Sequence, residues 1–366
     1  MQQGYLILST GEICRGAVFG AVDKVAAGEI VFNTSMTGYP EILTDPSYNG
    51  QIVLFTYPLI GNYGYSDEWK ESSGVKCEAI VVKKLYTGAL PPERESLDAA
   101  MRKRGIIGIS GVDTRSLTLR IRQKGSCNAV ICSEDRLEEA RELLSAFPAI
   151  TERDLITGVA VKEKVLNPDY GEGREKAPSS PSFSIAVVDF GIKTSIVTNF
   201  YRRGCAVTLF PPSFSSEDIL SGGYDMLFLS NGPGDPALLQ DQVKEVRKCI
   251  GKLPVCGICL GHQLITWALG GRTVKMTYGH HGGNQPVRDL DTGRSFVTAQ
   301  NHNYMSDMTS LPKSVHLWFT NANDGTVEGL YDRERHVRSV QFHPEASPGP
   351  EDAHWIFDAF LGEIEK

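Results

Sequence analysis

The sequence predicts an α/β protein: a C-terminal, mostly parallel sheet flanked by helices, preceded by a strand-rich α+β N-terminal domain. Two observations predict this arrangement. Short, continuously apolar runs alternate with helical stretches in residues 184–366, as in a parallel sheet covered on both faces. In residues 1–150, β-branched runs are mixed with helical stretches whose order does not reveal a topology.

In the C-terminal part, the apolar runs predict strands at 185–190, 205–210, 226–230, 255–258, 296–300, 315–320 and 337–342. Helical stretches are expected up to Arg203, before Gly251, at 260–270 and at 351–364. In parallel sheets, ligands bind at the carboxyl ends of the strands. The residues that follow each strand are therefore the candidate site.

The N-terminal part has β-branched runs at 30–40, 51–62 and 77–85, with helices expected at 97–104, 114–122 and 137–146. Asp113 is expected to cap the second of these helices, because its carboxylate can accept hydrogen bonds from first-turn amides.

Residues 167–183 are rich in proline, glycine, serine and charge, which predicts a linker or exposed loop. We therefore expect a domain at 1–150, a connecting segment at 151–183 and a second domain at 184–366. A length of 366 residues also favours two domains over one.

Composition restricts the class of protein. The net charge of -7 argues against a nucleic-acid binder. The N-terminus does not read as a signal peptide, and no apolar run is long enough to cross a membrane. Eight cysteines in a chain of this length are too sparse for a disulfide framework. A cytoplasmic setting is the resulting expectation.

The strongest local pattern is Gly-Ile-Cys-Leu-Gly at 257–261, where a strand meets a helix. This is the spacing of a nucleophile elbow, with a cysteine in place of serine. The turn is expected to expose the thiol of Cys259 above the sheet, at a helix N-terminus that favours the thiolate. The amide of Leu260 is expected to be one oxyanion donor.

Two other interpretations of Cys259 remain possible. With Cys256 it forms a C-x-x-C pair, as in redox or zinc sites, but Cys256 lies inside the predicted strand and no second pair exists. Cys259 could also be a buried structural cysteine, which is a common fate of free cysteine.

A base and an orienting carboxylate follow the last predicted strand. His343 is expected to reach the same sheet edge as Cys259, provided that strand 337–342 is parallel to strand 255–258. A thiol nucleophile needs such an imidazole, and the imidazole needs a carboxylate, here Glu345, to orient it. The loop at 230–236 also follows a strand, and its glycines leave amides free for an oxyanion or a carboxylate. A plain turn is the alternative.

The remaining histidines are weaker candidates. His280 and His281 stand between glycines without acidic or cysteine neighbours, so we expect a loop near the site and no metal site. His262 is expected to be a hydrogen-bonded structural residue. His316, His336 and His354 suggest no role.

Taken together, the segments at 230–236, 257–263 and 343–350 resemble the class I, triad-type glutamine amidotransferases. Further segments resemble the small-subunit family of carbamoyl-phosphate synthetase over nearly the whole chain: 33–53, 109–122, 189–193, 275–287 and 299–302. The N-terminal segments are the most specific of these.

This resemblance implies that Cys259 attacks the glutamine side chain, that His343 acts as base and then acid, and that Glu345 orients it. It also implies a set of glutamine-binding positions: Ser47, Gly232, Gly234, Leu260, Gln263, Asn301, Asn303 and Tyr304. Ser47 would place the site at the domain interface.

The resemblance further implies a partner. Ammonia would pass to a large subunit that uses ATP, Mg²⁺ and bicarbonate to make carbamoyl phosphate for arginine and pyrimidine synthesis. No cofactor and no metal are expected on this chain. The open alternatives are a glutaminase subunit of another synthetase and a non-catalytic regulatory subunit.

The sequence departs from the family at one point. The family has Asn-His-Gly before an aromatic residue, whereas this chain has asparagine at position 303, before Tyr304. Asparagine tolerates the left-handed backbone region better than most residues. We therefore expect Asn303 in that region, with glutamine binding preserved.

Overall fold

The computed structural model describes residues 2–364, which divide by their internal contacts into two units. Unit 1 contains residues 2–153 and 277–282, and unit 2 contains residues 154–276 and 283–364. The domain boundaries expected from composition stay a prediction.

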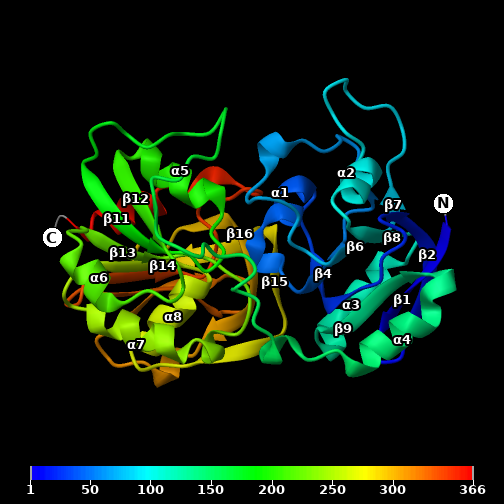
Figure 1. Cartoon of the computed structure of the whole chain (residues 1–366). Helices are drawn as coiled ribbons and strands as arrows, with labels where there is room; N and C mark the ends of the chain where they lie inside the picture. Colours follow the sequence, from blue (N-terminus) through cyan, green and yellow to red (C-terminus); the bar gives the residue numbers. More distant parts are fainter. Residues whose placement is uncertain (1, 365–366) are drawn as a thin grey trace. The chain divides into compact units, whose positions relative to one another are not determined.

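Unit 1 is built on a closed barrel with the strand order β1, β2, β8, β6, β4, β3, β9 (Figure 1). The strand bounds are β1 (Gln2–Leu8), β2 (Ile13–Gly20), β3 (Ala26–Asn33), β4 (Gln51–Phe55), β6 (Ala79–Val82), β8 (Ile107–Ser110) and β9 (Cys127–Ser133). Every one of these strands contributes apolar side chains to one buried cluster, among them Leu6, Ile52 and Ile131, which fills the barrel. Two short strands, β5 (Leu59–Ile60) and β7 (Lys84–Leu85), pair separately.

Three of the helices of unit 1 agree with the sequence expectations, whereas α1 was not predicted. The helices are α1 (Tyr39–Thr44), α2 (Leu97–Lys103), α3 (Thr114–Lys124) and α4 (Leu137–Ala146). The carboxylate of Asp113 accepts a hydrogen bond of 3.0 Å from the amide of Ser116, so the predicted cap of α3 is confirmed.

Unit 2 contains a large mixed sheet with the strand order β10, β12, β11, β13, β14, β19, β18, β17, β15, β16. The strands from β12 to β19 in this order pair parallel, and those from β19 to β15 pair antiparallel. The bounds are β10 (Val165–Leu166), β11 (Phe183–Val188), β12 (Cys205–Phe210), β13 (Met226–Leu229), β14 (Val255–Ile258), β15 (Thr273–Asp289), β16 (Ser295–Ser306), β17 (His316–Asn321), β18 (Val327–Asp332) and β19 (Val337–Val340).

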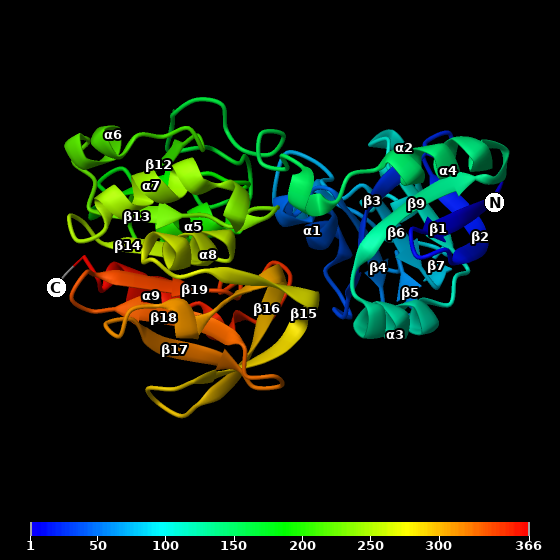
Figure 2. The same cartoon turned by 90° about the horizontal axis from the view of Figure 1, so that it is seen from below.

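Helices cover both faces of the parallel half of this sheet (Figure 2). Their bounds are α5 (Thr194–Arg202), α6 (Ser216–Ser221), α7 (Gln240–Cys249), α8 (Leu260–Ala268) and α9 (Ile356–Leu361). On β13, Phe228 faces α5 and α9 whereas Leu227 packs with the cluster of α6, α7 and α8. The alternating side chains of each parallel strand are thus buried on both faces, as the continuous apolar runs predict.

The α/β class is confirmed, but the sequence does not reveal the antiparallel half of the sheet. Strand β18 was not predicted, and β15 was read as a loop because it contains Gly279, Gly282, Gly283 and Pro286. Gly279 and Gly282 adopt φ of 69° and 151°, so the glycines bend the strand without ending it.

The proline- and serine-rich segment lies without helix or strand from residue 167 to 182. It is nevertheless attached to unit 2. Asn167 exchanges hydrogen bonds of 2.7 and 2.9 Å with Val207 of β12, and the hydroxyl of Tyr201 donates to the carbonyl of Pro168 at 3.0 Å. Across residues 2–364, none of the helices has the length and apolar character required to cross a membrane.

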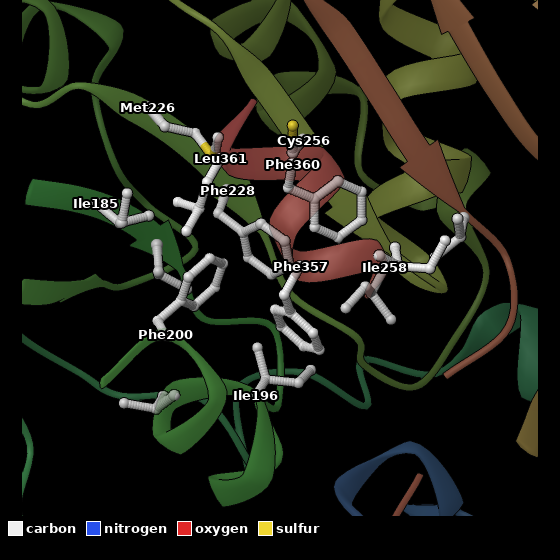
Figure 3. Packing of buried hydrophobic residues seen from close by; sticks show 14 of the residues in the cluster. Ile185, Ile196, Phe200, Met226, Phe228, Cys256, Ile258, Phe357, Phe360 and Leu361 are labelled. Atoms are coloured by element: carbon white, nitrogen blue, oxygen red, sulfur yellow. The ribbon is translucent and has the colours of Figure 1, made fainter. Parts of the chain in front are cut away.

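The aromatic core under α5 and α9 yields a stability prediction. The ring of Phe200 packs edge-on against Phe228 at 4.9 Å and against Phe357 at 5.4 Å (Figure 3). Phe200→Ala should lower the free energy of unfolding by about 3–5 kcal/mol, because it removes buried area and leaves a cavity. Denaturant titration measures this. Arg202→Ala, on the same helix at an exposed position, should change it by less than about 1 kcal/mol.

Candidate active site

Cys259 lies on a strained turn between β14 and α8. Its backbone has φ 54° and ψ −106°, a region that residues with a side chain rarely adopt. Such a conformation costs about 1–3 kcal/mol and persists only where the surrounding structure enforces it. The strand before and the helix after the turn enforce it here, so the elbow geometry predicted from the sequence is present.

The two glycines of this turn are required by close packing. A Cβ on Gly261 would lie 2.1 Å from the carbonyl oxygen of Leu229, and one on Gly257 would lie 2.9 Å from the carbonyl carbon of Gly261. The amide of Gly261 also donates to the carbonyl of Ser230 at 3.0 Å. The first turn of α8 is therefore held directly against the end of β13.

Strands β14 and β19 are parallel neighbours, with Ile258 opposite Val340. The amide of Cys259 donates to the carbonyl of Val340 at 2.9 Å, which continues the ladder into the turn. Three residues after Val340 the chain reaches His343. The condition on which the sequence argument depended, parallel pairing of these two strands, is confirmed.

His343 and Glu345 form a buried pair. The Nδ1 atom of His343 lies 2.6 Å from Oε1 of Glu345, and both residues are 2% exposed. Beyond them the chain turns sharply, with Ala346 and Ser347 at φ of 57° and 49°. The hydrogen bond leaves Nε2 of His343 as the ring nitrogen available for proton transfer.

Lys193 completes this cluster and was not assigned a role from the sequence. Its Nζ lies 3.0 Å from the same Oε1 of Glu345 and donates to the carbonyl of Ala346 at 2.5 Å. The side chain is 2% exposed. The sequence could have indicated such a role, because Lys193 follows the first predicted strand of the second domain and so lies at the carboxyl edge of the sheet.

The charges of this cluster shift the pKa values of its members in opposite directions. Burial alone would raise the pKa of Glu345, but the positive charge of Lys193 and then that of His343 lower it to about 2. Burial alone would lower the pKa of His343, but Glu345 and, to a lesser extent, Cys259 raise it. Glu345 is therefore ionised at neutral pH and stabilises the imidazolium form of His343.

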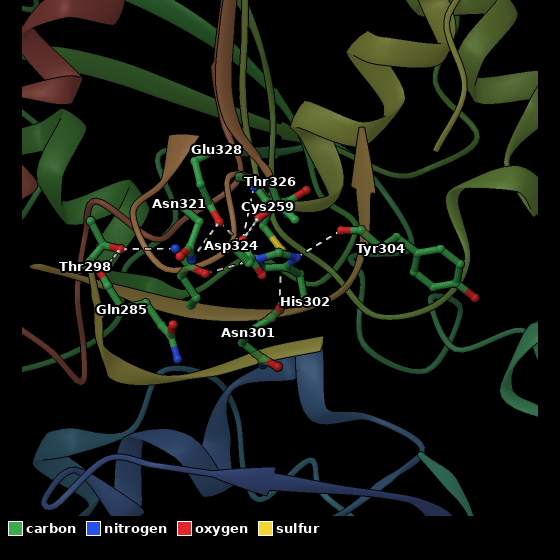
Figure 4. Close-up of polar contacts among 12 residues, drawn as sticks. Cys259, Gln285, Thr298, Asn301, His302, Tyr304, Asn321, Asp324, Thr326 and Glu328 are labelled. Atoms are coloured by element: carbon green, nitrogen blue, oxygen red, sulfur yellow. Dashed lines mark hydrogen bonds and ion pairs between the residues drawn. The ribbon is translucent and has the colours of Figure 1, made fainter. Parts of the chain in front are cut away.

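The thiol of Cys259 is covered by strand β16 (Figure 4). Its Sγ donates to the backbone carbonyl of Asn301 at 3.5 Å, and the residue is 2% exposed. The amide of His343 donates to Ala299 of the same strand at 2.8 Å. An exposed thiol was expected from the sequence. This was wrong, because the course of β16 across the elbow is a tertiary feature that the local pattern does not encode.

No hydrogen bond joins the thiol of Cys259 to the ring of His343 in this conformation. Among residues 2–364, Nε2 of His343 is buried and has no hydrogen-bond partner. Because Cys259 contributes to the raised pKa of His343, the two side chains are near each other.

Several residues expected to bind glutamine surround the elbow. The side-chain amide of Gln263 donates to the carbonyl of Tyr304 at 3.1 Å, and the hydroxyl of Tyr304 donates to Asp235 at 3.0 Å. These bonds join α8, β16 and the loop after β13. In that loop, Gly234 has φ 96°, and a Cβ on Gly232 would lie 2.4 Å from the carbonyl oxygen of Phe190.

Comparisons with known proteins agree with this geometry. Residues 6–131 match the model of the carbamoyl-phosphate synthase small chain, CPSase domain, and residues 186–362 match glutamine amidotransferase class-I. The chain is 46% identical over 98% of its length to a carbamoyl phosphate synthase small chain of Methanococcus maripaludis, 96% of which is covered. It is 44% identical over 97% of its length to that of Clostridium perfringens, 98% of which is covered.

The chain belongs to the carbamoyl-phosphate synthase small-chain family. It therefore has the glutamine amidotransferase domain of that family in its C-terminal part. Among solved structures, a putative GMP synthase subunit from Thermoplasma acidophilum is 26% identical with a TM-score of 0.45, and the match covers 50% of this chain and 94% of that one.

The conformation expected for Asn303 was wrong. Asn303 lies within β16, and it is not among the positive-φ residues of the described chain. Pairing of β16 in the sheet requires extended backbone at this position, and that constraint overrides the local tolerance of asparagine for the left-handed region. The role of Asn303 in glutamine binding stays a prediction.

The structure also shows the surroundings of three histidines other than His343. His262 is fully buried between the hydroxyls of Ser339 and Ser306, each 2.9 Å away, and burial lowers its pKa to about 3. It is therefore a neutral structural residue, as expected. His280 and His281 lie within strand β15 rather than in the loop that was predicted.

Ser47, another residue expected to contact glutamine, belongs to unit 1. It lies in the short 3-10 helix Pro46–Tyr48, is 6% exposed, and its amide donates to the carboxylate of Asp45 at 2.9 Å. Its expected contact with glutamine, and a site at the domain interface, stay predictions.

The packing of Gly261 yields a prediction for the elbow. Gly261→Ala should slow the alkylation of Cys259 by a glutamine-like electrophile at least about tenfold, because the added methyl group collides with Leu229 and displaces the turn. Gly158→Ala is the control, since a Cβ at Gly158 has no neighbour within 4 Å and its φ is not positive. An unchanged labelling rate in Gly261→Ala would contradict the claim that close packing of Gly261 against Leu229 fixes the turn.

The lowered pKa of Glu345 yields a prediction on pH. The folded chain holds Glu345 ionised down to about pH 2, whereas an unfolded glutamate titrates near about 4.3. Its stabilisation is thus complete above about pH 5 and is lost as the pH falls towards 2. Glu345→Gln should cost about 3–5 kcal/mol of unfolding free energy at pH 7, because it leaves Lys193 without its counter-charge.

The test compares unfolding curves of the two proteins between pH 7 and pH 3. The difference between them should shrink on acidification. The exposed Glu334→Gln control should show no such trend. A difference that stays constant with pH would show that the charge of Glu345 does not stabilise the fold.

Proposed function

We propose that this chain hydrolyses the side-chain amide of glutamine and supplies the ammonia to a large carbamoyl-phosphate synthase subunit. One observation carries the proposal. A cysteine on a strained elbow and a carboxylate-paired histidine follow adjacent parallel strands, β14 and β19, at the same edge of the sheet. This arrangement meets the requirement of a thiol nucleophile for a nearby, oriented base.

In the first half of the proposed reaction, Sγ of Cys259 attacks the amide carbon of glutamine while its proton passes to Nε2 of His343. The tetrahedral intermediate collapses when His343 returns that proton to the amide nitrogen. The C–N bond breaks, ammonia leaves and a thioester remains. Glu345 stabilises the imidazolium that exists between the two proton transfers.

In the second half, His343 takes a proton from water, whose oxygen attacks the thioester carbon. The C–S bond breaks, the proton returns to the thiolate of Cys259, and glutamate leaves. Both halves pass through an oxyanion. The amide of Leu260, at the first position of α8, and the amides of Gly232 and Gly234 are the proposed donors, because they lie at the carboxyl edge of the sheet beside the elbow.

Several residues of the proposed glutamine site also hydrogen-bond to neighbouring elements of unit 2, and these bonds hold the site together. Gln263, Asn301 and Tyr304 meet where β16 passes the start of α8. The proposed contacts also include Asn303 and, from unit 1, Ser47. The thiol of Cys259, which contacts the carbonyl of Asn301, lies beside the residues of this set in unit 2.

The proposed partner follows from the family. Relatives with 46% identity are named small chains, a name that implies a large chain. We propose that this large chain binds ATP, Mg²⁺ and bicarbonate and makes carbamoyl phosphate for arginine and pyrimidine synthesis in the cytoplasm. The present chain then contributes ammonia and needs no cofactor of its own.

The proposal is tested by Cys259→Ser. The hydroxyl of serine is a far weaker nucleophile in this setting, so glutamine hydrolysis should fall by at least about 10³-fold. In complex with the large chain, synthesis of carbamoyl phosphate from added ammonium chloride should persist, because the thiol takes no part in that route. Glutamate release and carbamoyl phosphate formation are the two measurements.

Cys256→Ala serves as the matched control, since Cys256 is also buried and lies in β14, three residues before Cys259. It should keep glutaminase activity within about threefold, which also tests the C-x-x-C alternative. Glutamine-dependent synthesis that survives Cys259→Ser would overturn the assignment of the nucleophile.

A further inference from the structure

A layer of buried polar side chains lies beside the elbow in unit 2, and the proposed reaction does not use it (Figure 4). Strand β16 contributes Gln300 and His302, β17 contributes Asn321, and β18 contributes Glu328. These residues are 0–4% exposed. A buried polar layer is costly unless its donors and acceptors match, so its hydrogen-bond directions are informative.

The orientation of the Gln300 amide is fixed by its neighbours. The hydroxyl of Thr298 donates to the backbone carbonyl of Gln285 at 2.9 Å. Its oxygen is then free to accept, and Nε2 of Gln300 donates to it at 3.3 Å. The Oε1 atom of Gln300 therefore points away from Thr298 and faces Nε2 of His302 at 3.2 Å.

Both ring nitrogens of His302 consequently face hydrogen-bond acceptors. Nε2 faces Oε1 of Gln300, and Nδ1 lies 2.9 Å from the backbone carbonyl of Tyr304. A neutral imidazole has only one N–H, so one nitrogen would present its lone pair to an acceptor. Donation by both nitrogens requires the imidazolium form.

Glu328 supplies the opposite charge. Its Oε1 lies 3.8 Å from Nε2 of His302 and accepts from Nδ2 of Asn321 at 3.4 Å. The side chain of Glu328 is 0% exposed and that of His302 is 1% exposed. A buried cation is tolerated where such a partner is present, and removing the partner leaves an uncompensated charge.

We propose that Glu328 is a positioning residue that keeps His302 protonated and thereby fixes residues 301–304 of β16 beside the elbow. The carbonyl of Tyr304 accepts from both His302 and Gln263, while the carbonyl of Asn301 accepts from the thiol of Cys259. Loss of the charge on His302 breaks one bond of this set. The inference rests on the proposed function, since Asn301 and Tyr304 are proposed glutamine contacts.

The charge on His302 is tested first, without any assay of activity. In the full chain labelled with ¹⁵N-histidine, the His302 ring should show two protonated nitrogens at pH 7, and H302Q identifies its signals by their absence. In E328Q, the ring should become a neutral single tautomer at the same pH. A neutral His302 in the unaltered chain would overturn the inference and leave the glutaminase proposal standing.

The kinetic test uses the same E328Q variant, which keeps the shape and one acceptor oxygen at position 328 and replaces the charged carboxylate by a neutral amide. The KM for glutamine should rise at least about tenfold, equivalent to about 1.4 kcal/mol, while kcat changes less. E363Q is the matched control, since Glu363 is 2% exposed and its carboxylate accepts from Arg338, near the opposite end of β19, at 2.8 Å. It should leave KM unchanged.

The remaining outcomes are decisive as well. An unchanged KM in E328Q would overturn the positioning role. Equal losses of kcat and of melting temperature in E328Q and E363Q would show a merely structural carboxylate and would also overturn it. An unaltered chain without glutaminase activity, alone and with its large chain, would refute the proposed function, whereas the nuclear magnetic resonance result would still decide the charge state of His302.

Discussion

The parallel pairing of β14 with β19 is the constraint on which the site depends. Parallel strands end at the same edge of a sheet, so the residues that follow them meet even though 84 positions separate Cys259 from His343 in the sequence. The register continues through the amide of Cys259, which donates to Val340. The strained turn is thereby fixed at both ends, by the ladder on one side and by the tight seat of Gly261 on the other.

Buried charge is the second organising feature of this unit. Glu345 lies beside Lys193 and His343, and Glu328 lies beside His302. In a medium of low dielectric such groups interact strongly, and each is tolerated only with its partner. Glu345 favours the proton on His343 during the proposed transfer, whereas Glu328 is proposed to hold a strand in place. The same physical interaction is thus proposed to support proton transfer in one pair and the position of a strand in the other.

Strand β16 joins these two features. It hydrogen-bonds to His343 through Ala299, receives the thiol of Cys259 at Asn301, and is tied to α8 through Gln263. In the described conformation the thiol of Cys259 is therefore shielded from solvent and bonded to strand β16. The extended backbone of Asn303 belongs to the same strand, so its conformation follows from the sheet and not from its own preference.

Local patterns in the sequence determined the elbow, the histidine–carboxylate pair, the cap of α3 and most strands of the parallel half, because these features depend on residues close together in the chain. Tertiary structure alone decided the antiparallel half, the course of β16, the covering of the thiol and the approach of Lys193 to Glu345. Such features depend on which distant strands pair, and hydrophobic periodicity reports only whether a segment is buried. The candidate nucleophile was therefore readable from the sequence, whereas its resting environment was not.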